Sequence, residues 1–267
     1  MIDTEAEWAI VTGGSSGIGK AIAKELLKMG INCVLVARDG DRLKDAAKDL
    51  GEARCRLITL DLSEPGAVQE LDEQTEGIDI SICIHSAGVT YMGLFVDQPE
   101  VVSANMQGLH IVATTEFFRI FGKRFELRRS GAFVMVSSSL GYLNLPRGAE
   151  YSATKRYMIT LGEALRPEFK AKGINIVTLA PGGTKTPMAT DLANYLDMTK
   201  LPFPMGSPDK VAKAAVNQLD KGGVVIPGIE NRMTVFMIKH LPGSRLMSKF
   251  MGWMIKRALY PTGGRAL

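Results

Sequence analysis

Short runs of apolar, β-branched residues alternate with helical stretches along most of the 267-residue chain, and this alternation restricts the fold more than any other feature. Strands are predicted at Trp8–Thr12, Asn32–Ala37, Arg56–Leu60, Ile78–His85, Gly131–Val136, Ile174–Leu179 and Val224–Ile226. Helices are predicted at Lys20–Met29, Arg42–Leu50, around Pro99–Phe125, at Tyr151–Lys172 and from Pro208 to about Leu219. Strands that alternate with helices form βαβ units. The chain is therefore predicted to be an α/β protein with a doubly wound parallel sheet and helices on both faces.

The composition is that of an ordinary globular protein, with 46% hydrophobic and 22% charged residues. It excludes the collagen-like, disordered, disulfide-stapled and polytopic membrane classes. The net charge of +4 is uneven, because residues 232–260 hold six basic and no acidic side chains while the rest has a small acidic excess. This distribution excludes a uniformly basic surface, and we expect no nucleic-acid partner.

Further features of the sequence argue against a disulfide-bonded, metal-binding, secreted or membrane-spanning protein. Each cysteine lies in an apolar, strand-like run without CxxC spacing, which predicts buried free thiols in a reducing compartment. The cysteines are Cys33, Cys55 and Cys83. The histidines lack the spacing of metal ligands, so we expect no metal site. The acidic N-terminus lacks a signal peptide's apolar segment, and no apolar run reaches the roughly 18 residues of a membrane span, so a cytoplasmic protein is expected.

A glycine-rich turn joins the first predicted strand to the first predicted helix. It reads Thr12-Gly13-Gly14-Ser15-Ser16-Gly17-Ile18-Gly19. In a doubly wound sheet the pyrophosphate of a dinucleotide lies at this turn, because glycines let the backbone approach the phosphates and the helix N-terminus offers unpaired N–H groups. The residues predicted to contact the cofactor here are Gly13, Ser15, Ser16, Gly17, Ile18 and Gly19.

Two further motifs accompany this turn. The segment Tyr151-Ser152-Ala153-Thr154-Lys155 falls on a predicted helix, and a Pro181-Gly182 turn follows the strand Ile174–Leu179. In order and spacing, the three motifs resemble the short-chain dehydrogenase/reductase family over roughly residues 6–230. The resemblance implies a single Rossmann-type domain, a nicotinamide cofactor and redox chemistry on carbonyls and alcohols. We expect the catalytic domain at residues 1–231 and a C-terminal amphipathic extension at 232–267.

The end of the second strand bears on the choice of nicotinamide cofactor. NAD-binding folds carry an acidic side chain there for the ribose 2′-hydroxyl, whereas this strand ends in Val36-Ala37-Arg38. The guanidinium of Arg38 suits the 2′-phosphate of NADP(H), which is the predicted cofactor. Asp39 follows immediately and offers the alternative of a carboxylate that binds NAD.

The resemblance assigns further cofactor contacts. The residues that it matches to the adenine are Asp61 and Leu62. Ala87 and Gly88 fit the family's close passage of backbone beside the cofactor, although His85-Ser86 replaces the usual Asn-Asn pair. We expect His85 to be a packed, hydrogen-bonded structural residue. The segment that holds the nicotinamide carboxamide in the family is matched by Pro181, Gly182, Thr184 and Thr186.

Tyr151 and Lys155 lie four residues apart on a predicted helix and so share a face, and both are also among the residues predicted to contact the cofactor. A neighbouring ammonium and an oxidised nicotinamide would lower the pKa of the tyrosine from about 10, which lets it exchange a proton with a substrate alkoxide. Ser138 lies 13 residues before Tyr151 and matches the family's catalytic serine, with Ser137 and Ser139 as the nearest rivals.

Asn105 matches the family's helix asparagine, which supports a proton relay through water to Lys155. In the family, the helices that correspond to those of Asn105 and Tyr151 pair subunits, so a homodimer or homotetramer is expected. Pro167 falls inside the predicted catalytic helix, where a missing N–H should kink it without loss of chemistry.

The substrate is expected to meet an apolar segment, Met188–Met205. It contains Met188, Leu192, Tyr195, Leu196, Met198, Leu201, Phe203 and Met205. Such flexible apolar surface suits an apolar carbonyl or alcohol: a fatty keto compound, a long-chain keto-base of the 3-ketosphinganine kind or a steroid-like ketone. Simple helix packing is the alternative for this segment. For the whole chain, the alternative to a reductase is a non-catalytic dinucleotide-binding regulatory or scaffold protein.

The last predicted element, residues 244–259, is an amphipathic helix. Its basic face carries Arg245, Lys249 and Lys256. Its apolar face carries Leu246, Met247, Phe250, Met251, Met254 and Ala258, with Trp253 beside them. This composition is typical of a helix that lies on an anionic membrane surface. The alternative is a helix docked on the protein's own core or on a sister subunit.

Overall fold

The computed structural model describes residues 7–193, 196–200, 205–240 and 244–259. Within these ranges the strands are β1 (Trp8–Thr12), β2 (Asn32–Ala37), β3 (Cys55–Thr59), β4 (Ile80–His85), β5 (Gly131–Val136), β6 (Ile174–Leu179) and β7 (Gly223–Val225). They form one sheet in the order β3-β2-β1-β4-β5-β6-β7, and every neighbouring pair is parallel. The predicted doubly wound sheet is confirmed.

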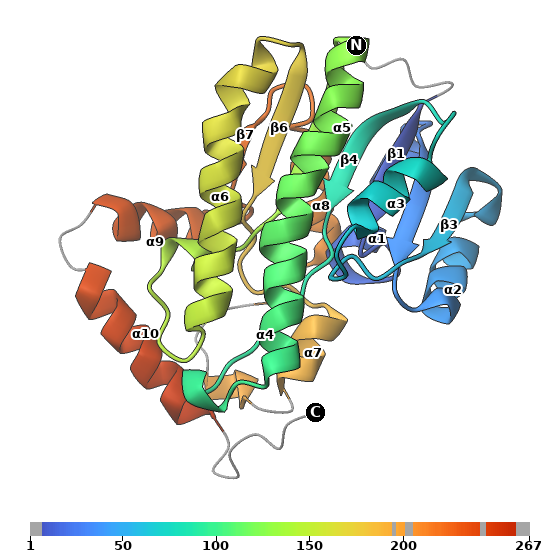
Figure 1. The fold of residues 1–267 in the computed structure, drawn as a ribbon. Coiled ribbons are helices and arrows are strands. Elements are labelled where there is room, and N and C mark those ends of the chain that lie inside the picture. The colour runs from blue at the N-terminus through green and yellow to red at the C-terminus, as the bar shows by residue number, and fades with distance from the viewer. Residues whose placement is uncertain (1–6, 194–195, 201–204, 241–243, 260–267) are drawn as a thin grey trace.

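Helices cover both faces of the sheet (Figure 1). One face packs against α1 (Gly17–Lys28), α2 (Gly40–Leu50) and α8 (Pro208–Val216). The other packs against α3 (Ala67–Gln74), α5 (Thr114–Arg128) and α6 (Ala149–Lys170). Because the central strands are buried on both faces, they are largely apolar and do not alternate between apolar and polar residues. Burial of both faces is the reason that each central strand appears in the sequence as a continuous run of apolar, β-branched residues.

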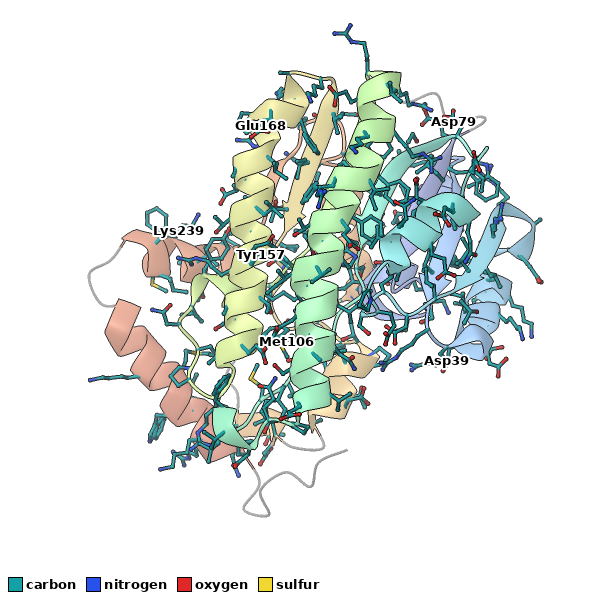
Figure 2. The ribbon with its side chains drawn as sticks, viewed as in Figure 1. Asp39, Asp79, Met106, Tyr157, Glu168 and Lys239 are labelled. Atoms are coloured by element: carbon teal, nitrogen blue, oxygen red, sulfur yellow. The ribbon has the colours of Figure 1, made fainter. Side chains whose placement is uncertain are left out.

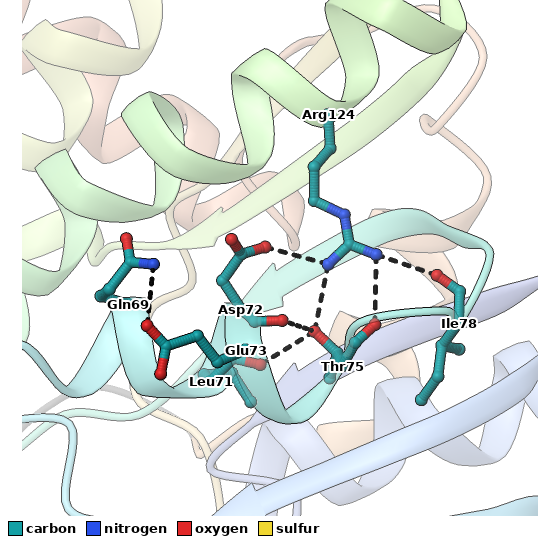
Figure 3. A network of polar contacts seen from close by, with 7 residues as sticks. All are labelled: Gln69, Leu71, Asp72, Glu73, Thr75, Ile78 and Arg124. Atoms are coloured by element: carbon teal, nitrogen blue, oxygen red, sulfur yellow. Dashed lines mark hydrogen bonds and ion pairs between the residues drawn. The ribbon is translucent and has the colours of Figure 1, made fainter.

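The helix α3 is absent from the sequence-based expectation. Its residues are largely acidic or amide side chains, and its apolar stripe is limited to Ala67, Val68 and Leu71. The structure fixes its C-terminal end through Arg124 of α5 (Figure 3). That guanidinium donates to the Asp72 carboxylate at 3.0 Å and, through Nη2, to the carbonyl oxygen of Ile78 at 2.9 Å. A contact so distant in sequence leaves no local signal.

The predicted helical region around 99–125 is divided. Helix α4 (Glu100–Gln107) continues into a π-helical turn, Gly108–Ala113, before α5 begins. Gly108 is required at this turn, because a Cβ there would lie 2.6 Å from the carbonyl oxygen of Ser63. By contrast, α6 runs through Pro167, which lies in its last turn, and ends at Lys170.

The C-terminal helices α9 (Ile229–His240) and α10 (Ser244–Ala258) pack on the rest of the fold. Val235 joins a buried cluster with Ile159 and Ala180. The α10 residues Met251, Met254, Ile255 and Ala258 are buried against the loop that contains Leu143 and Leu145. Part of the apolar face predicted for membrane contact therefore faces the protein interior, and the side chains of 244–248 lie outside the described residues. A functional boundary at residue 231 stays a prediction.

The cysteines differ in burial. Cys33 and Cys83 are buried free thiols, as expected. The prediction for Cys55 is wrong, because β3 is the edge strand of the sheet and leaves this thiol partly exposed. None of the described helices has the length and apolar character that crossing a bilayer requires.

Candidate active site

Most of the predicted site residues lie at the edge of the sheet where the carboxyl ends of β1, β4, β5 and β6 meet. The strand order reverses between β1 and β4, which is where doubly wound sheets bind their ligands. Two glycines of the turn after β1 adopt left-handed backbone conformations, Gly13 at φ +64° and Gly17 at φ +56°. A Cβ on Gly19 would clash with the carbonyl oxygen of Gly13. The turn is therefore tight enough that side chains at these positions are excluded.

The N-terminus of α1 is open to a ligand. Ser16 is its N-cap, with an extended backbone, yet no side chain caps the helix. The first amides of a helix have no partner within it, and they form a ready site for phosphate. Gly13, Ser15, Ser16, Gly17 and Ile18 are all partly exposed here. A glycine cradle over uncapped amides fits the pyrophosphate of a dinucleotide.

The segment after β6 lies against this turn. A Cβ on Gly17 would be 3.1 Å from Cγ2 of Thr186, so the two loops touch. The Thr184 hydroxyl donates to the carbonyl oxygen of Gly182 at 2.9 Å, and the Pro181 carbonyl accepts from the backbone N–H of Ser139 at 2.8 Å. The glycine turn after β1, the serines after β5 and the segment after β6 thus lie together at one edge of the sheet.

Arg38 and Asp39 at the end of β2 differ in what their side chains do. The Asp39 carboxylate is the N-cap of α2, where Oδ1 accepts from the backbone N–H groups of Asp41 at 3.1 Å and Arg42 at 3.0 Å. Figure 2 shows Asp39 at the beginning of this helix. Arg38 is exposed to solvent. The carboxylate that would favour NAD is therefore engaged by the fold, whereas the guanidinium is accessible.

The residues matched to the adenine, Asp61 and Leu62, and the loop after β4 are held in place by hydrogen bonds and burial. Asp61 Oδ1 accepts from the N–H and the hydroxyl of Ser63, at 2.9 and 2.6 Å. The Leu62 side chain is buried in the core, so only its backbone could meet a ligand. In the loop after β4, the N–H of Ala87 donates to the Thr12 hydroxyl at 3.1 Å.

His85 is the packed structural residue that was expected. It is fully buried; Nδ1 lies 3.1 Å from the Thr12 hydroxyl and Nε2 lies 2.8 Å from the carbonyl oxygen of Leu109. Burial lowers the pKa of its imidazole to about 4, so the ring is neutral at physiological pH. It ties β1 and β4 to the π-helical turn.

Tyr151 and Lys155 lie together on α6, with the Lys155 ammonium 5.8 Å from the centroid of the Tyr151 ring. Lys155 is 4% exposed and donates to the carbonyl oxygen of Val136 at 3.0 Å. Burial lowers its pKa to about 7. Burial also raises the pKa of Tyr151, while a hydrogen bond with Ser138 lowers it. The net rise is opposite to the expected fall, because the burial of the phenol outweighs its hydrogen bond with Ser138.

The three consecutive serines after β5 have separate roles. The Ser137 hydroxyl donates to the backbone carbonyl of Lys155 at 2.7 Å and so holds β5 to α6. The Ser138 hydroxyl accepts a hydrogen bond from the N–H of Leu140 at 3.1 Å, and its own proton remains free to be donated. Of the three serines, Ser138 is the one whose hydrogen bond lowers the pKa of Tyr151. Ser139 is partly exposed and contributes its backbone N–H to the loop of Pro181.

An apolar wall surrounds Tyr151. Its buried members are Met92, Leu143, Leu145, Leu196, Met251, Met254, Ile255 and Ala258. The wall includes α10 and the segment expected to cover the substrate. The two are joined where Leu196 pairs with Leu259 and where the N–H of Asp197 donates to the carbonyl oxygen of Ala258 at 2.8 Å. Tyr195, Leu201 and Phe203 lie outside the described residues.

Comparison with known proteins agrees with this arrangement. The model of the short chain dehydrogenase family matches residues 7–196. The chain belongs to the short-chain dehydrogenase family. A very-long-chain 3-oxoacyl-CoA reductase-like protein of Arabidopsis thaliana is 31% identical, covering 88% of this chain and 77% of the relative. The 7beta-hydroxysteroid dehydrogenase of Clostridium sardiniense is 32% identical over 85% and 87% of the two chains.

Among solved structures, a short-chain dehydrogenase from Sphingobium yanoikuyae in complex with NADPH superposes with a TM-score of 0.76. It is 28% identical and covers 91% of this chain and 95% of its own. As a member of this family, the protein is an oxidoreductase that uses a nicotinamide dinucleotide. Within the described ranges, no three His, Cys, Asp or Glu side chains gather as metal ligands would.

The role predicted for Asn105, a relay through water to Lys155, stays a prediction. Asn105 lies on α4 before the π-helical turn, partly exposed, and among described residues no hydrogen bond joins its side chain to Lys155. The ring that lies beside Tyr151 is that of His110, with 6.0 Å between centroids. His110 was missed because a π-helical turn has no sequence signature, and its extra residue changes which side chains face α6.

Proposed function

We propose that the protein reduces apolar ketones, or oxidises the corresponding alcohols, with NADP(H) as cofactor. The observation that carries this proposal is Tyr151, whose ring lies above a buried ammonium and against a wall of apolar side chains. A tyrosine so placed can give a proton to an alkoxide, and the wall favours a substrate with apolar bulk. The relatives named above act, by name, on a 3-oxoacyl-CoA and on a hydroxysteroid, both of which carry such bulk.

The preference for NADP(H) rests on the end of β2. Asp39 is the N-cap of α2, so rotating its carboxylate toward a ribose 2′-hydroxyl would cost that cap, typically about 1 kcal/mol. Arg38 has no such role and is accessible to a 2′-phosphate. The glycine turn and the uncapped start of α1 would hold the pyrophosphate, and the segment Pro181–Thr186 would hold the carboxamide.

In the proposed mechanism, the nicotinamide supplies the hydride, and the residues of the chain bind and protonate the oxygen. Ser138 donates a hydrogen bond to the carbonyl oxygen, which strengthens as negative charge develops there. The Tyr151 hydroxyl gives its proton to that oxygen, and in the reverse direction the phenolate accepts one. Lys155 lies close enough to stabilise the phenolate when it is charged.

The proposal is tested by a panel of ketones with increasing apolar bulk, assayed with NADPH and NADH in parallel. We expect oxidation of NADPH that is fastest with long-chain or polycyclic ketones, and slower oxidation of NADH. Stoichiometric binding of NADPH without oxidation across the whole panel would instead support a non-catalytic dinucleotide-binding protein.

We also propose that the end of the molecule formed by α9 and α10 contacts an anionic membrane surface. Exposed large apolar side chains gather there, namely Ile229, Met233 and Met237 on α9 and Phe250 and Trp253 on α10. Exposed basic side chains accompany them, namely Arg232, Lys239, Lys249, Lys256 and Arg257. Apolar rings beside cations are what an interfacial helix presents to anionic lipid. The protein would then be cytoplasmic and peripheral to a membrane.

The membrane proposal predicts flotation with anionic vesicles at low salt and little flotation with neutral ones. Removing α10 is a poor test, because Met251 and Met254 are part of the core. We therefore choose Phe250→Ser with Trp253→Ser, which changes exposed positions only, and expect flotation to be lost. Leu127→Ser is the matched control, since Leu127 is 87% exposed at the far end of α5. Equal flotation of all proteins, or none by the wild type, contradicts the proposal.

A homodimer or homotetramer through the helices that carry Asn105 and Tyr151 completes the proposal. Its support is the family resemblance, together with two exposed apolar side chains, Val101 on α4 and Val112 in the π-helical turn between α4 and α5. Light scattering at micromolar concentration measures the mass directly, and a monomer would contradict it.

A further inference from the structure

Tyr151, the proposed proton donor, lies in a helix turn that the helix's own backbone holds weakly. It is the third residue of α6, which begins at Ala149. The first N–H groups of a helix have no carbonyl partner within it. The N-cap is Gly148, which has no side chain to offer, and nothing among the described residues accepts from the N–H groups of residues 149–151. The first backbone bond of the helix joins the N–H of Ser152 to the carbonyl oxygen of Gly148, at 2.9 Å.

The apolar wall leaves little room for a capping side chain at this N-cap. A Cβ on Gly148 would lie 2.7 Å from the sulfur of Met92 and 2.8 Å from Cδ2 of Leu145, and both of these side chains are buried in the wall. Serine, threonine, aspartate and asparagine, the usual capping residues, all have a Cβ. Any of them at this position would displace the wall, so the first turn of α6 has to be held from another element.

The carboxylate of Glu150 attaches this turn to α4, which lies beside the N-terminal half of α6 (Figure 1). Glu150 Oε1 accepts from the Ser103 hydroxyl at 2.7 Å and from Nε2 of Gln107 at 2.8 Å. Oε2 accepts from Nε2 of Gln98, two residues before α4 begins. Nε2 of Gln107 also donates to the Ser103 hydroxyl at 3.0 Å, so the donors support one another. We call these four side chains the Glu150 cluster.

Other hydrogen bonds of the turn do not replace this attachment. The Ser152 hydroxyl donates to a carbonyl oxygen of the same turn, at 3.1 Å. Tyr151 bonds with Ser138, but that contact belongs to the site that has to be positioned. Among the described residues, the only other hydrogen bonds that join a side chain of residues 149–152 to another element are those of Glu150.

We propose that Glu150 is the positioning residue for Tyr151. By binding three donors of the α4 region, its carboxylate fixes the uncapped first turn of α6 and so sets where the tyrosine hydroxyl meets the substrate oxygen. The proposal rests on the function proposed above, because it takes Tyr151 as the proton donor. A carboxylate suits this position twice, since it accepts several hydrogen bonds and its negative charge is favourable at the N-terminus of a helix.

The first test needs no turnover. Hydrogen exchange followed by mass spectrometry compares the backbone amides in the first and second halves of α6. In Glu150→Ala we expect faster exchange in the first half and unchanged exchange in the second. Glu150→Gln should exchange as the wild type does, because its amide oxygen accepts from Ser103 and Gln107, and Gln98 can turn its own amide oxygen toward the new NH₂ group. Equal exchange of the first half in the wild type and Glu150→Ala overturns the proposal, whether or not the protein reduces ketones.

The matched control is Glu168→Ala. Glu168 is an exposed glutamate at the other end of α6 (Figure 2), and none of the described residues forms a hydrogen bond or ion pair with it. The same substitution there should leave exchange in the first half of the helix, and turnover, as in the wild type.

The second test asks whether the Glu150 cluster serves the chemistry. In the ketone assay, Glu150→Ala should lower kcat about 10- to 100-fold with little change in KM or in the Kd of NADPH, because the ring stays in the wall while its hydroxyl is misplaced. Glu150→Gln should restore most of kcat, since it keeps the hydrogen bonds without the charge. Ser103→Ala combined with Gln107→Leu should lower kcat in the same direction and add little to Glu150→Ala. This pair removes the same bonds from α4 and replaces Glu150→Ala if that variant does not fold.

The outcomes separate the two proposals. If the wild type reduces no ketone, the proposed function fails, and the exchange experiment still decides whether Glu150 holds the first turn. If the wild type is active and kcat is unchanged in Glu150→Ala, the positioning role is wrong, even where thermal stability falls. A loss of kcat that Glu150→Gln does not restore, or that accompanies a change of mass in light scattering, also contradicts the positioning role.

Discussion

Replacing Tyr151 with phenylalanine is expected to lower turnover of the best ketone by about 10²- to 10⁴-fold, the usual contribution of a proton donor. The substitution removes one hydroxyl and keeps the ring that packs against the apolar wall. NADPH should bind with unchanged affinity, because the glycine turn and Arg38 are untouched. Steady-state kinetics and a titration of NADPH fluorescence measure the two quantities separately.

The matched control is Tyr157→Phe. Tyr157 lies on the same helix, and its hydroxyl is hydrogen-bonded to that of Thr115 at 2.6 Å, outside the site (Figure 2). The control should keep its turnover and lose at most about 1 kcal/mol of stability with this hydrogen bond. If Tyr151→Phe turns over as fast as the control does, the assignment of the proton donor is wrong.

The second large effect is expected at Arg38. Arg38→Ala should weaken NADPH binding by about 1.5–3 kcal/mol, the value of a hydrogen bond to a charged group, which is about 10- to 150-fold in Kd. NADH lacks the 2′-phosphate, so its binding should change little. Calorimetry with both nucleotides measures the difference.

Asp39→Asn is the companion variant, because asparagine also caps helices and preserves the start of α2. It should leave the preference for NADPH as it is in the wild type. A wild type that binds NADH more tightly, and that loses this binding in Asp39→Asn, would show that Asp39 binds the ribose and that the protein is NAD-dependent.

The fold was predictable because its signals are local. The β-branched runs, the glycine turn and the Ser207-Pro208 start of α8 each depend on neighbouring residues, and the structure has all three. Helix α3 was not predictable, since its end depends on Arg124, which comes from α5. The burial of Cys55 could not be judged because sequence does not show which strand lies at the edge of the sheet.

The site residues that belong to sequence motifs could be predicted. Residues that backbone geometry brings to the site could not. Tyr151, Lys155 and Ser138 come together as their spacing indicated. The role predicted for Asn105 stays a prediction, and the π-helical turn that follows it brings the ring of His110 beside Tyr151, which no motif indicated. An amphipathic pattern also does not show whether the apolar face of a helix packs on the protein core or contacts a membrane. On α10, Met251 and Met254 are buried while Phe250 and Trp253 are exposed.

The central claim is a direct hydride transfer between NADP(H) and an apolar carbonyl. Its most direct measurement uses NADPH that carries deuterium at both C4 positions, together with the best ketone of the panel, and analyses the alcohol by mass spectrometry and NMR. The account predicts one deuterium on the carbinol carbon of each alcohol formed, and no labelled alcohol from Tyr151→Phe on the same timescale. An alcohol without deuterium, or NADPH that stays bound and unoxidised with every ketone, would contradict it.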